Sequence, residues 1–493
     1  MAKRTIYLIF ALCFVLGALI SVVSCGSEAG DDSSVGPKQS ETEESSGDSA
    51  PKETIDPGFA DELPELNFGG KTFNFLVDSD PAFRHLYDVN VEGEIGEIVN
   101  DTIYKRNRTV EERLNIKIED VESSAAQKTI TNAVASGDTT YTGVWLLVDR
   151  FFAASLAGPF VNLHNVPHLN LDKKYWDPNA VSDMTISGKL YGMTGDITTA
   201  TNMFTHLLLY NKSLGADYGF PNLYNLVREG KWTFDKFAEL SKDIYKDLNG
   251  NGKADVEDFF SVYITPAAYE AFFSSAGEKW VEKNAAGEIV FSDMNEKKIA
   301  VLDKIEGMFT KKDNVWCGYE QPQPFTNERA IFYDGDLGIM SEEYRDLEVD
   351  FGILPLPKFS EEQNRYYVYA YPFFPFLSIP TTITGEELEM AGASLEALAS
   401  ESYKTLTPAF YEIALANKYV RDEESYEMLD IILRSRVYDL LYWGQWDSFR
   451  NWGSGLVSAM QKGGGVYVST YEKNIDKSLK KIDEIVDIYA NLD

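Results

Sequence analysis

An acid- and glycine-rich stretch, Asp247–Asp258 (DLNGNGKADVED), has the residue types and the spacing of a calcium-binding loop. Oxygen ligands would come from loop positions 1, 3, 5, 7, 9 and 12, the residue at position 7 using its backbone carbonyl: Asp247, Asn249, Asn251, Lys253, Asp255 and Asp258. Gly252 occupies position 6, where such a loop turns sharply. We expect a structural Ca²⁺ site of modest affinity, because two ligands are uncharged and position 12 is the short Asp. The alternative is a polar Asn-Gly turn without metal.

A second polar group, Asp149-Arg150, directly follows the apolar run Thr142–Val148 (TGVWLLV). Such a run is typical of a buried parallel strand. Ligands of open α/β sheets bind outside the carboxyl ends of the strands, so both residues are candidates for contact with a solute. The alternative is that Asp149 caps the next helix and Arg150 forms a surface ion pair.

Candidate solute ligands also occur in two further segments. The small polar segment Gly195–Asn202 could absorb a change in backbone dihedral angles, so we interpret it as a hinge with Asp196 and Asn202 as candidate ligands. The run Tyr366–Pro380 (YYVYAYPFFPFLSIP) is dense in aromatic residues, which usually form core, but Tyr371 could turn its ring toward a cleft. Aromatic faces suit sugars because they pack on C–H faces and leave the hydroxyl groups free for hydrogen bonds.

The elements that must position these residues alternate between strands and helices. The patterns predict strands over Lys71–Val77, Ile116–Val121, Thr142–Val148 and Phe204–Tyr210. They predict helices over Ile98–Leu114, Gln127–Ala135, Trp232–Tyr245 and Asn295–Lys311, a helical series over Leu388–Trp443 and a final helix over Thr470–Ala490.

Length and composition narrow the classes of function. A chain of 493 residues favours two domains or lobes. The formal charge of −33, from 78 acidic and 45 basic side chains, argues against nucleic-acid binding, because the chain would repel phosphates. Of three cysteines only Cys317 falls in the folded body, so we expect no disulfide and no zinc pair there, and Cys317 half-buried.

The N-terminus has the features of a secretory signal. Lys3 and Arg4 precede the apolar run Ile6–Val23, and Ser24-Cys25 follows it. The Ser-Cys pair resembles a lipobox, which implies that Cys25 carries lipid and becomes the mature N-terminus. An uncleaved membrane-spanning anchor is the alternative. Either reading places the body outside the cytoplasm, tethered to the cell membrane.

Four segments in this order resemble the extracellular solute-binding proteins of ABC importers, the family-1 lipoproteins related to maltodextrin-binding proteins: Gly188–Gly192 (GKLYG), Tyr210–Lys212 (YNK), Trp232–Phe237 (WTFDKF) and Asp247–Asp255 (DLNGNGKAD). The resemblance extends in scattered segments from about Lys71 to Ile488. It implies an α/β, two-lobed periplasmic-binding-protein-like (type II) fold with a hinge and an interlobe ligand cleft. It also implies a monomer, not an enzyme, that delivers a solute, a sugar or oligosaccharide, to the permease of an ABC importer.

The resemblance also implies roles for particular residues. In the family, the Asp and Arg of a strand-"DRF" segment bond to sugar hydroxyl groups, and here these roles fall on Asp149 and Arg150. Glu343 and Tyr344 follow the stretch NERAIFYDGDLGIM, near where relatives carry a Trp that stacks on the sugar. Trp446 is the candidate for a second stacking Trp late in the chain.

The predicted organisation is a signal peptide over residues 1–24 and a disordered acidic tether over residues 25–66. The first lobe would comprise residues 67–198 and 371–440, and the second lobe residues 199–370 and 441–493. Two other classes of function are left open by composition alone. A secreted carbohydrate hydrolase would use paired carboxylates, and a calcium-dependent adhesion protein would need an exposed recognition face.

Overall fold

The computed structural model describes residues 60–79, 89–318, 323–338, 347–414, 423–443 and 447–492. The chain divides into residues 1–54 and residues 55–493, and every described residue belongs to the second unit. The predicted signal peptide with Cys25, and the candidate ligands Glu343, Tyr344 and Trp446, lie outside the described residues. Within the described ranges, no helix is both long and apolar enough to cross a membrane.

The first of two large sheets has the strand order β13-β3-β1-β2. Its strands are β1 (Lys71–Asp78), β2 (Ile116–Ser123), β3 (Gly143–Leu147) and β13 (Pro375–Ser378). Strand β1 runs parallel to both β2 and β3, and β13 adds antiparallel to β3 with Leu377 opposite Trp145. The helices α2 (Ile98–Leu114) and α3 (Ala126–Ser136) make the two crossovers between the parallel strands. All five residues of β3 are buried, as its apolar sequence predicts.

The second large sheet has the order β11-β4-β10-β6-β5, and β9 pairs with β6 off this path. Its strands are β4 (His206–Asn211), β5 (Tyr245–Lys246), β6 (Phe259–Ile264), β9 (Val315–Cys317), β10 (Ala330–Asp336) and β11 (Phe351–Leu354). Strand β10 is parallel to β6 and antiparallel to β4. We call the parts of the molecule built on the two sheets the first lobe and the second lobe.

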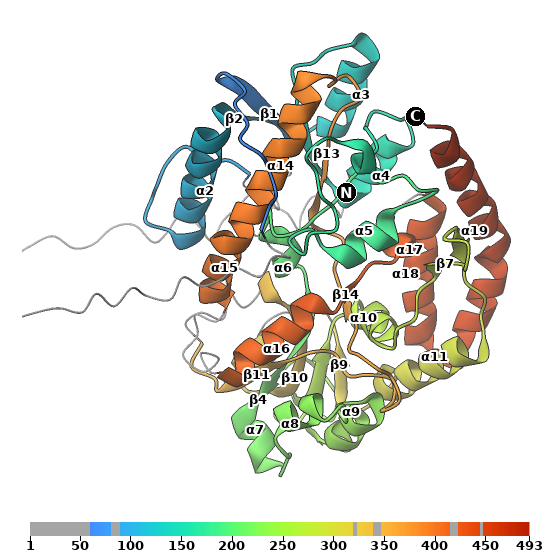
Figure 1. Ribbon diagram of the computed structural model, residues 1–493. Coiled ribbons are helices and arrows are strands. Elements are labelled where there is room, and N and C mark those ends of the chain that lie inside the picture. The colour runs from blue at the N-terminus through green and yellow to red at the C-terminus, as the bar shows by residue number, and fades with distance from the viewer. Residues whose placement is uncertain are drawn as a thin grey trace, which may run out of the picture. The chain divides into compact units, whose positions relative to one another are not determined.

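The remaining elements cover and connect the sheets (Figure 1). The other helices are α4 (Val148–Ser155), α5 (Pro178–Met184), α6 (Ala200–Met203), α7 (Lys212–Asp217), α8 (Leu223–Arg228), α9 (Phe234–Ser241), α10 (Ala268–Ser275), α11 (Glu296–Phe309), α12 (Gln323–Thr326), α14 (Glu386–Lys404), α15 (Leu406–Ala414), α16 (Glu423–Arg434), α17 (Leu440–Trp443), α18 (Asp447–Lys462) and α19 (Val466–Asn491). The short strands are β7 (Val281–Lys283), β8 (Ile289–Phe291), β12 (Val368–Tyr369) and β14 (Arg436–Val437).

The segments that pass between the lobes lie side by side. Residues 194–205 lead from the first lobe into β4, and residues 366–374 lead back to β13. Thr205 and Ala370 form an antiparallel bridge, and the Tyr371 N–H donates to the Phe204 carbonyl over 2.7 Å. A third passage follows α16, where β14 runs parallel to β12. These backbone hydrogen bonds fix the crossing segments relative to one another.

Most predicted elements are confirmed within a few residues, because their apolar patterns are local and strong. The helix predicted over Trp232–Tyr245 is too long: it ends at Ser241, and Asp243 takes a φ of 59° before strand β5 begins. A strand, and not a helix, therefore leads into the acid-rich loop. Cys317 is half-buried, as predicted.

The end of the predicted tether is folded, and the predicted return segment contacts both sheets. Residues 60–66 of the predicted tether belong to the folded unit, where Asp61 accepts two hydrogen bonds from Arg113, of 2.9 and 2.6 Å. Residues 60–66 are therefore folded, in contrast to the predicted disorder up to residue 66. Within the predicted return of residues 371–440, β13 joins the first sheet but α16 packs on β11 of the second. The boundaries themselves stay a prediction.

Candidate functional site

A cavity of about 470 Å³ opens among α5, α15, α16, β14 and the predicted hinge segment. Its polar lining includes both candidate ligands of that segment, Asp196 and Asn202. Asp177, Asn179 and Arg436 come to the same cavity from other parts of the chain. The sequence analysis did not single out these three residues, because nothing local marks them as a group.

Arg436 is the centre of the polar lining. Its Nε donates to Asp177 Oδ2 over 2.8 Å and its Nη1 to Asn202 Oδ1 over 2.6 Å. Its backbone carbonyl accepts from Asn179 Nδ2 over 2.9 Å. Burial alone would lower the pKa of Arg436, but the carboxylate of Asp177 raises it above the ordinary value, so the guanidinium stays charged.

Asp177 uses both of its carboxylate oxygens. Oδ1 caps α5 by accepting from the N–H groups of Asn179 and Ala180, over 3.0 and 3.2 Å. Oδ2 accepts from Arg436 and, over 2.6 Å, from the Tyr438 hydroxyl. The sequence Asp-Pro-Asn at the start of α5 is a typical helix start, and the cap orients the carboxylate toward Arg436.

Asp196 is half-buried beside this group and accepts from the Thr407 hydroxyl over 3.0 Å. Burial raises the pKa of Asp196 to about 6, and the positive charge of Arg436 only partly opposes this. Its position depends on Gly195, since a Cβ there would lie 2.2 Å from the Tyr175 carbonyl oxygen. The hinge backbone can pass this close to Tyr175 only with glycine.

Tyr403 and Tyr411, both half-buried, add aromatic side chains to the lining of the cavity. Trp176 is not part of this lining, because it is fully buried and its Nε1 donates to Glu396 Oε2 over 3.0 Å. The cavity thus combines flat rings with hydrogen-bonding groups, as small-molecule sites do.

Asp149 and Arg150 lie apart from the cavity, at the carboxyl end of β3. Asp149 is in the first turn of α4, and its Oδ1 accepts from the Arg150 N–H over 2.8 Å. Arg150 forms an ion pair with the buried Asp78 at the end of β1. The strand ends therefore bring Asp78 and Arg150 to one edge of the first sheet. Solute binding by Asp149 and Arg150 stays a prediction.

Tyr371 lies in a third place, a cluster on the second lobe where the lobes are joined. Its ring centre is 5.4 Å from that of His206, whose Nδ1 lies 3.3 Å from Asp334 Oδ1. Burial alone would lower the pKa of His206, but Asp334 raises it. Nearby, Tyr369 donates to Glu270 over 3.2 Å, and burial raises the pKa of Glu270 to about 7.

This cluster lies at the carboxyl ends of β6 and β10, the edge where open-sheet proteins bind ligands. The sequence analysis named the stretches that contain Asp334 and His206, but it made neither residue nor Glu270 a candidate. His206 begins β4 and Glu270 lies in α10, so no local pattern marks the three as a group.

The acid-rich loop satisfies its own carboxylates with hydrogen bonds. Asp247 accepts from the N–H groups of Gly250 and Gly252 over 2.7 and 2.9 Å. Asp255 accepts from the side-chain amide of Asn251 over 2.7 Å. Asp258 is buried and accepts from the Leu248 N–H over 3.0 Å and the Tyr245 hydroxyl over 2.9 Å.

Asp258 therefore joins the two ends of the loop. Asn251 turns its amide nitrogen toward Asp255, whereas a metal ligand at this position would turn its amide oxygen toward the ion. Across the part of the chain that the structure describes, no group of three His, Cys, Asp or Glu side chains is arranged to hold a metal ion. The oxygen-rich composition fits Ca²⁺, but this arrangement of the side chains would have to change around it. Calcium binding stays a prediction.

Comparison with known proteins supports this fold. Residues 110–376 match the family described as bacterial extracellular solute-binding protein. No curated protein matches the chain. Among solved structures, a cyclic α-maltosyl-1,6-maltose binding protein from Arthrobacter globiformis has a TM-score of 0.55 at 12% identity, covering 85% of this chain and 99% of that one.

Two further structures are similar. UgpB from Mycobacterium tuberculosis, in complex with glycerophosphocholine, has a TM-score of 0.52 at 16% identity over 84% of this chain and 99% of its own. An ABC substrate-binding protein from Listeria monocytogenes, in complex with cycloalternan, has a TM-score of 0.50 at 13% identity over 86% of this chain and 100% of its own. At these identities the likeness concerns the fold, and it confirms the predicted two-lobed type II class.

Proposed function

The chain belongs to the bacterial extracellular solute-binding protein family, whose members bind without catalysis, and we propose that its solute is a neutral sugar or oligosaccharide. The protein captures this solute between its lobes and delivers it to the permease of an ABC importer. The secreted hydrolase considered above is set aside, since the family is not enzymatic.

The observation that carries the proposal is the charge balance of the cavity. Three basic residues, Lys174, Arg434 and Arg436, stand against three acidic ones, Asp177, Asp196 and Asp430. Arg436 is paired with Asp177, and Arg434 with Asp430 over 2.7 Å. A phosphodiester needs a cation that is available to it, because a buried anion without a partner is strongly disfavoured. A polyhydroxylated neutral solute needs hydrogen-bonding groups and flat rings, and both line this cavity.

The relatives with similar structures bind both kinds of solute. One is described in complex with cycloalternan, one as a cyclic α-maltosyl-1,6-maltose binding protein and one in complex with glycerophosphocholine. The charge balance favours the first kind for this chain. The edge residues Asp149, Arg150 and Tyr371 are proposed to contact parts of a longer oligosaccharide.

Thermal unfolding of the whole secreted chain tests the proposal. The panel would contain maltose, maltotriose, cyclic glucose oligosaccharides and glycerophosphocholine. A solute at 100 times its dissociation constant stabilises the folded state by about 2.7 kcal/mol, which is readily seen. We expect a shift with one neutral sugar class and none with glycerophosphocholine. A shift with glycerophosphocholine alone would overturn the sugar proposal and leave the family assignment intact.

We also propose that the protein is anchored to the outer face of the cell membrane through lipid on Cys25. The support is the basic and apolar N-terminus that ends in Ser24-Cys25. Cys25→Ser should abolish labelling by a radioactive fatty acid and release the protein from the membrane fraction. Labelling that persists in the variant would contradict the anchor.

A further inference from the structure

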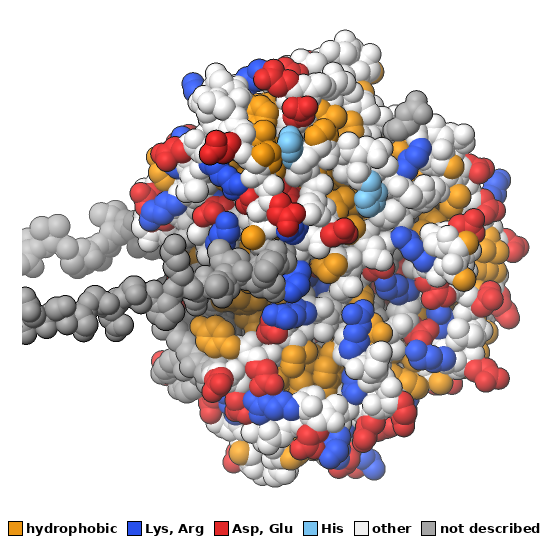
Figure 2. Space-filling view, viewed as in Figure 1, with side chains coloured by type: hydrophobic (Ala, Val, Ile, Leu, Met, Phe, Trp, Pro, Cys, Tyr) orange, Lys and Arg blue, Asp and Glu red, His pale blue; other side chains and the backbone are white. Residues whose placement is uncertain are grey.

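Arg106 is a buried cation of helix α2 that does not itself line the cavity. Figure 2 shows Lys and Arg side chains at the surface, mixed with acidic ones, whereas Arg106 is only 1% exposed. Burial lowers the pKa of Arg106 to about 9, which Glu401 opposes only in part, so the guanidinium is still charged at neutral pH. A buried cation costs free energy that an apolar side chain of similar volume would not. The arrangement therefore points to a role other than stability.

All five N–H groups of the guanidinium donate to uncharged acceptors. Nε and Nη2 donate to Asn107 Oδ1 over 3.0 and 2.8 Å, and Nη2 also donates to the Val89 carbonyl over 2.8 Å. Nη1 donates to the Ile197 carbonyl over 3.0 Å and to Ser402 Oγ over 3.1 Å. Asn107 and Val89 thus fix the guanidinium, and one nitrogen joins two further segments.

Both segments that Nη1 joins belong to the lining of the cavity. Ile197 directly follows Asp196 in the predicted hinge segment, and Ser402 directly precedes Tyr403 near the end of α14. Asp196 and Tyr403 line the cavity. Each acceptor of Nη1 is therefore one residue away from a side chain of the lining. A shift of either acceptor moves that neighbour, because the peptide unit between them is rigid.

A second contact joins the same two parts of the chain. The Thr407 hydroxyl of α15 donates to Asp196 Oδ1 over 3.0 Å. The Thr405 N–H donates to the Ser402 carbonyl over 3.3 Å, so the residue that Arg106 holds is also bonded to the start of α15. Arg106 and Thr407 therefore tie the predicted hinge segment to α14 and α15 at two points.

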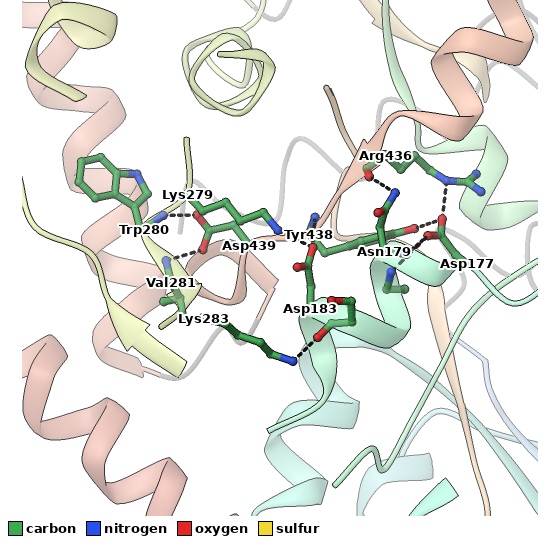
Figure 3. A network of polar contacts seen from close by, with 12 residues as sticks. Asp177, Asn179, Asp183, Lys279, Trp280, Val281, Lys283, Arg436, Tyr438 and Asp439 are labelled. Carbon is green, nitrogen blue, oxygen red and sulfur yellow. Dashed lines mark hydrogen bonds and ion pairs between the residues drawn. The ribbon is translucent and has the colours of Figure 1, made fainter. Parts of the chain in front are cut away.

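The other end of the predicted hinge segment is held by a second arginine. Arg436 donates to Asn202, and it also donates to Asp177 at the start of α5, as Figure 3 shows. Arg436 lines the cavity itself, whereas Arg106 reaches the lining only through the neighbours of its acceptors. Hydrogen bonds from two buried arginines thus hold the segment at both ends.

We propose that Arg106 is a positioning residue of the cavity, which holds Asp196 and Tyr403 in the places from which they contact the solute. The proposal rests on the proposed function, because it takes this cavity as the solute site. The role requires arginine, since lysine has three donors on a single atom and cannot bond to Asn107 and to both cavity segments at once.

The test compares Arg106→Lys with Val110→Ala in the whole chain. Arg106→Lys keeps the charge and removes the fork of donors. Val110 is 1% exposed on the same helix and does not line the cavity, so Val110→Ala is the matched control for lost stability. Ser402→Ala removes a single acceptor, and it tests the same contact if Arg106→Lys does not fold.

The first readout is affinity for the solute found in the thermal screen. It should fall about tenfold in Arg106→Lys and roughly threefold in Ser402→Ala, as expected for losing hydrogen bonds that position the lining. In Val110→Ala it should change by less than about twofold, because the lining is intact.

The second readout is the titration of Asp196, which needs no solute. Carbon-13 NMR of protein labelled in aspartate follows it, with Asp196→Asn for assignment. The pKa of Asp196 should fall from about 6 toward 3.8 in Arg106→Lys and not in Val110→Ala, because a carboxyl group released from its place is better solvated.

Either an unchanged titration or an affinity no lower than that of the control would overturn the positioning role. If no solute binds the wild type, the proposed function fails, and the titration still decides whether Arg106 positions Asp196.

Discussion

The Nε of Arg436 lies 2.8 Å from Asp177 Oδ2, and these side chains are only 10% and 3% exposed. A buried pair of this kind is poor evidence for stability by itself, but breaking it leaves an uncompensated charge. Because Asp177 also caps α5, the pair connects the charge state of the cavity to the position of a helix. The first prediction follows from this.

Arg436→Met should reduce the free energy of unfolding by about 3 kcal/mol, because it leaves Asp177 without its cation. Solute affinity should fall at least about tenfold, since Asn202 loses the donor that orients it. Denaturant unfolding and isothermal titration calorimetry measure the two effects.

The matched control is Arg228→Met, which removes the exposed pairs with Glu424 and Glu427. We expect that control to change the free energy of unfolding far less than Arg436→Met does and to leave binding unchanged. Equal effects of the two substitutions would mean that Arg436 contributes no more to stability and binding than an exposed cation does.

The second prediction concerns pH. The pKa of Asp196 is raised to about 6 in the folded protein, whereas it is near 3.8 in the unfolded chain. The folded state therefore binds the proton more tightly, and the contribution of Asp196 to stability is full at pH values below 3.8 and is lost as the pH rises through 6. Asp196→Asn removes this dependence.

The free energy of unfolding of the wild type minus that of Asp196→Asn should thus fall by up to about 2 kcal/mol between pH 4 and pH 7. Denaturant unfolding at several pH values measures this difference. A difference that rises with pH would show that the attraction to Arg436 outweighs the effect of burial.

The sequence could predict the elements but only parts of the site. Helix α2 buries Ile103, Val110 and Leu114 along one face, and this spacing is visible within 17 residues. The polar group at Arg436 is different, because its partners Asp177 and Asn202 are 259 and 234 positions away. No local pattern specifies such a meeting, and only the packed lobes bring it about. Asp196 and Asn202, which line the same cavity, could be named as candidates because small polar residues mark their segment as a predicted hinge.

The third prediction concerns the packing of α14. A Cβ on Gly392 would lie 1.9 Å from the carbonyl oxygen of Pro167, which belongs to the backbone and cannot turn away. Gly392→Ala should therefore lower the free energy of unfolding by about 3 kcal/mol. Gly307 in the exposed part of α11 has nothing within 4 Å of the same position, and Gly307→Ala should stabilise by up to about 1 kcal/mol. Similar melting temperatures for the two variants would contradict the close approach of α14 to Pro167.

The last prediction concerns the acid-rich loop. If the loop binds Ca²⁺ with a dissociation constant of about 1 mM, 10 mM Ca²⁺ should stabilise the folded state by about 1.4 kcal/mol. Asp247→Asn and Asp255→Asn should each remove this gain, since each takes away a charged ligand. Asp235→Asn, an exposed acid on α9 outside the loop, is the control and should keep the gain.

Melting temperatures in Ca²⁺ and in EDTA measure the effect, and Mg²⁺ at the same concentration separates specific binding from screening by salt. The hydrogen bonds within the loop make a null result informative. Asp247 already accepts from two backbone N–H groups, and Asp258 already joins the ends of the loop. If no variant and no cation shifts the melting temperature, these contacts alone hold the loop, and it is the polar turn that the sequence left as the alternative.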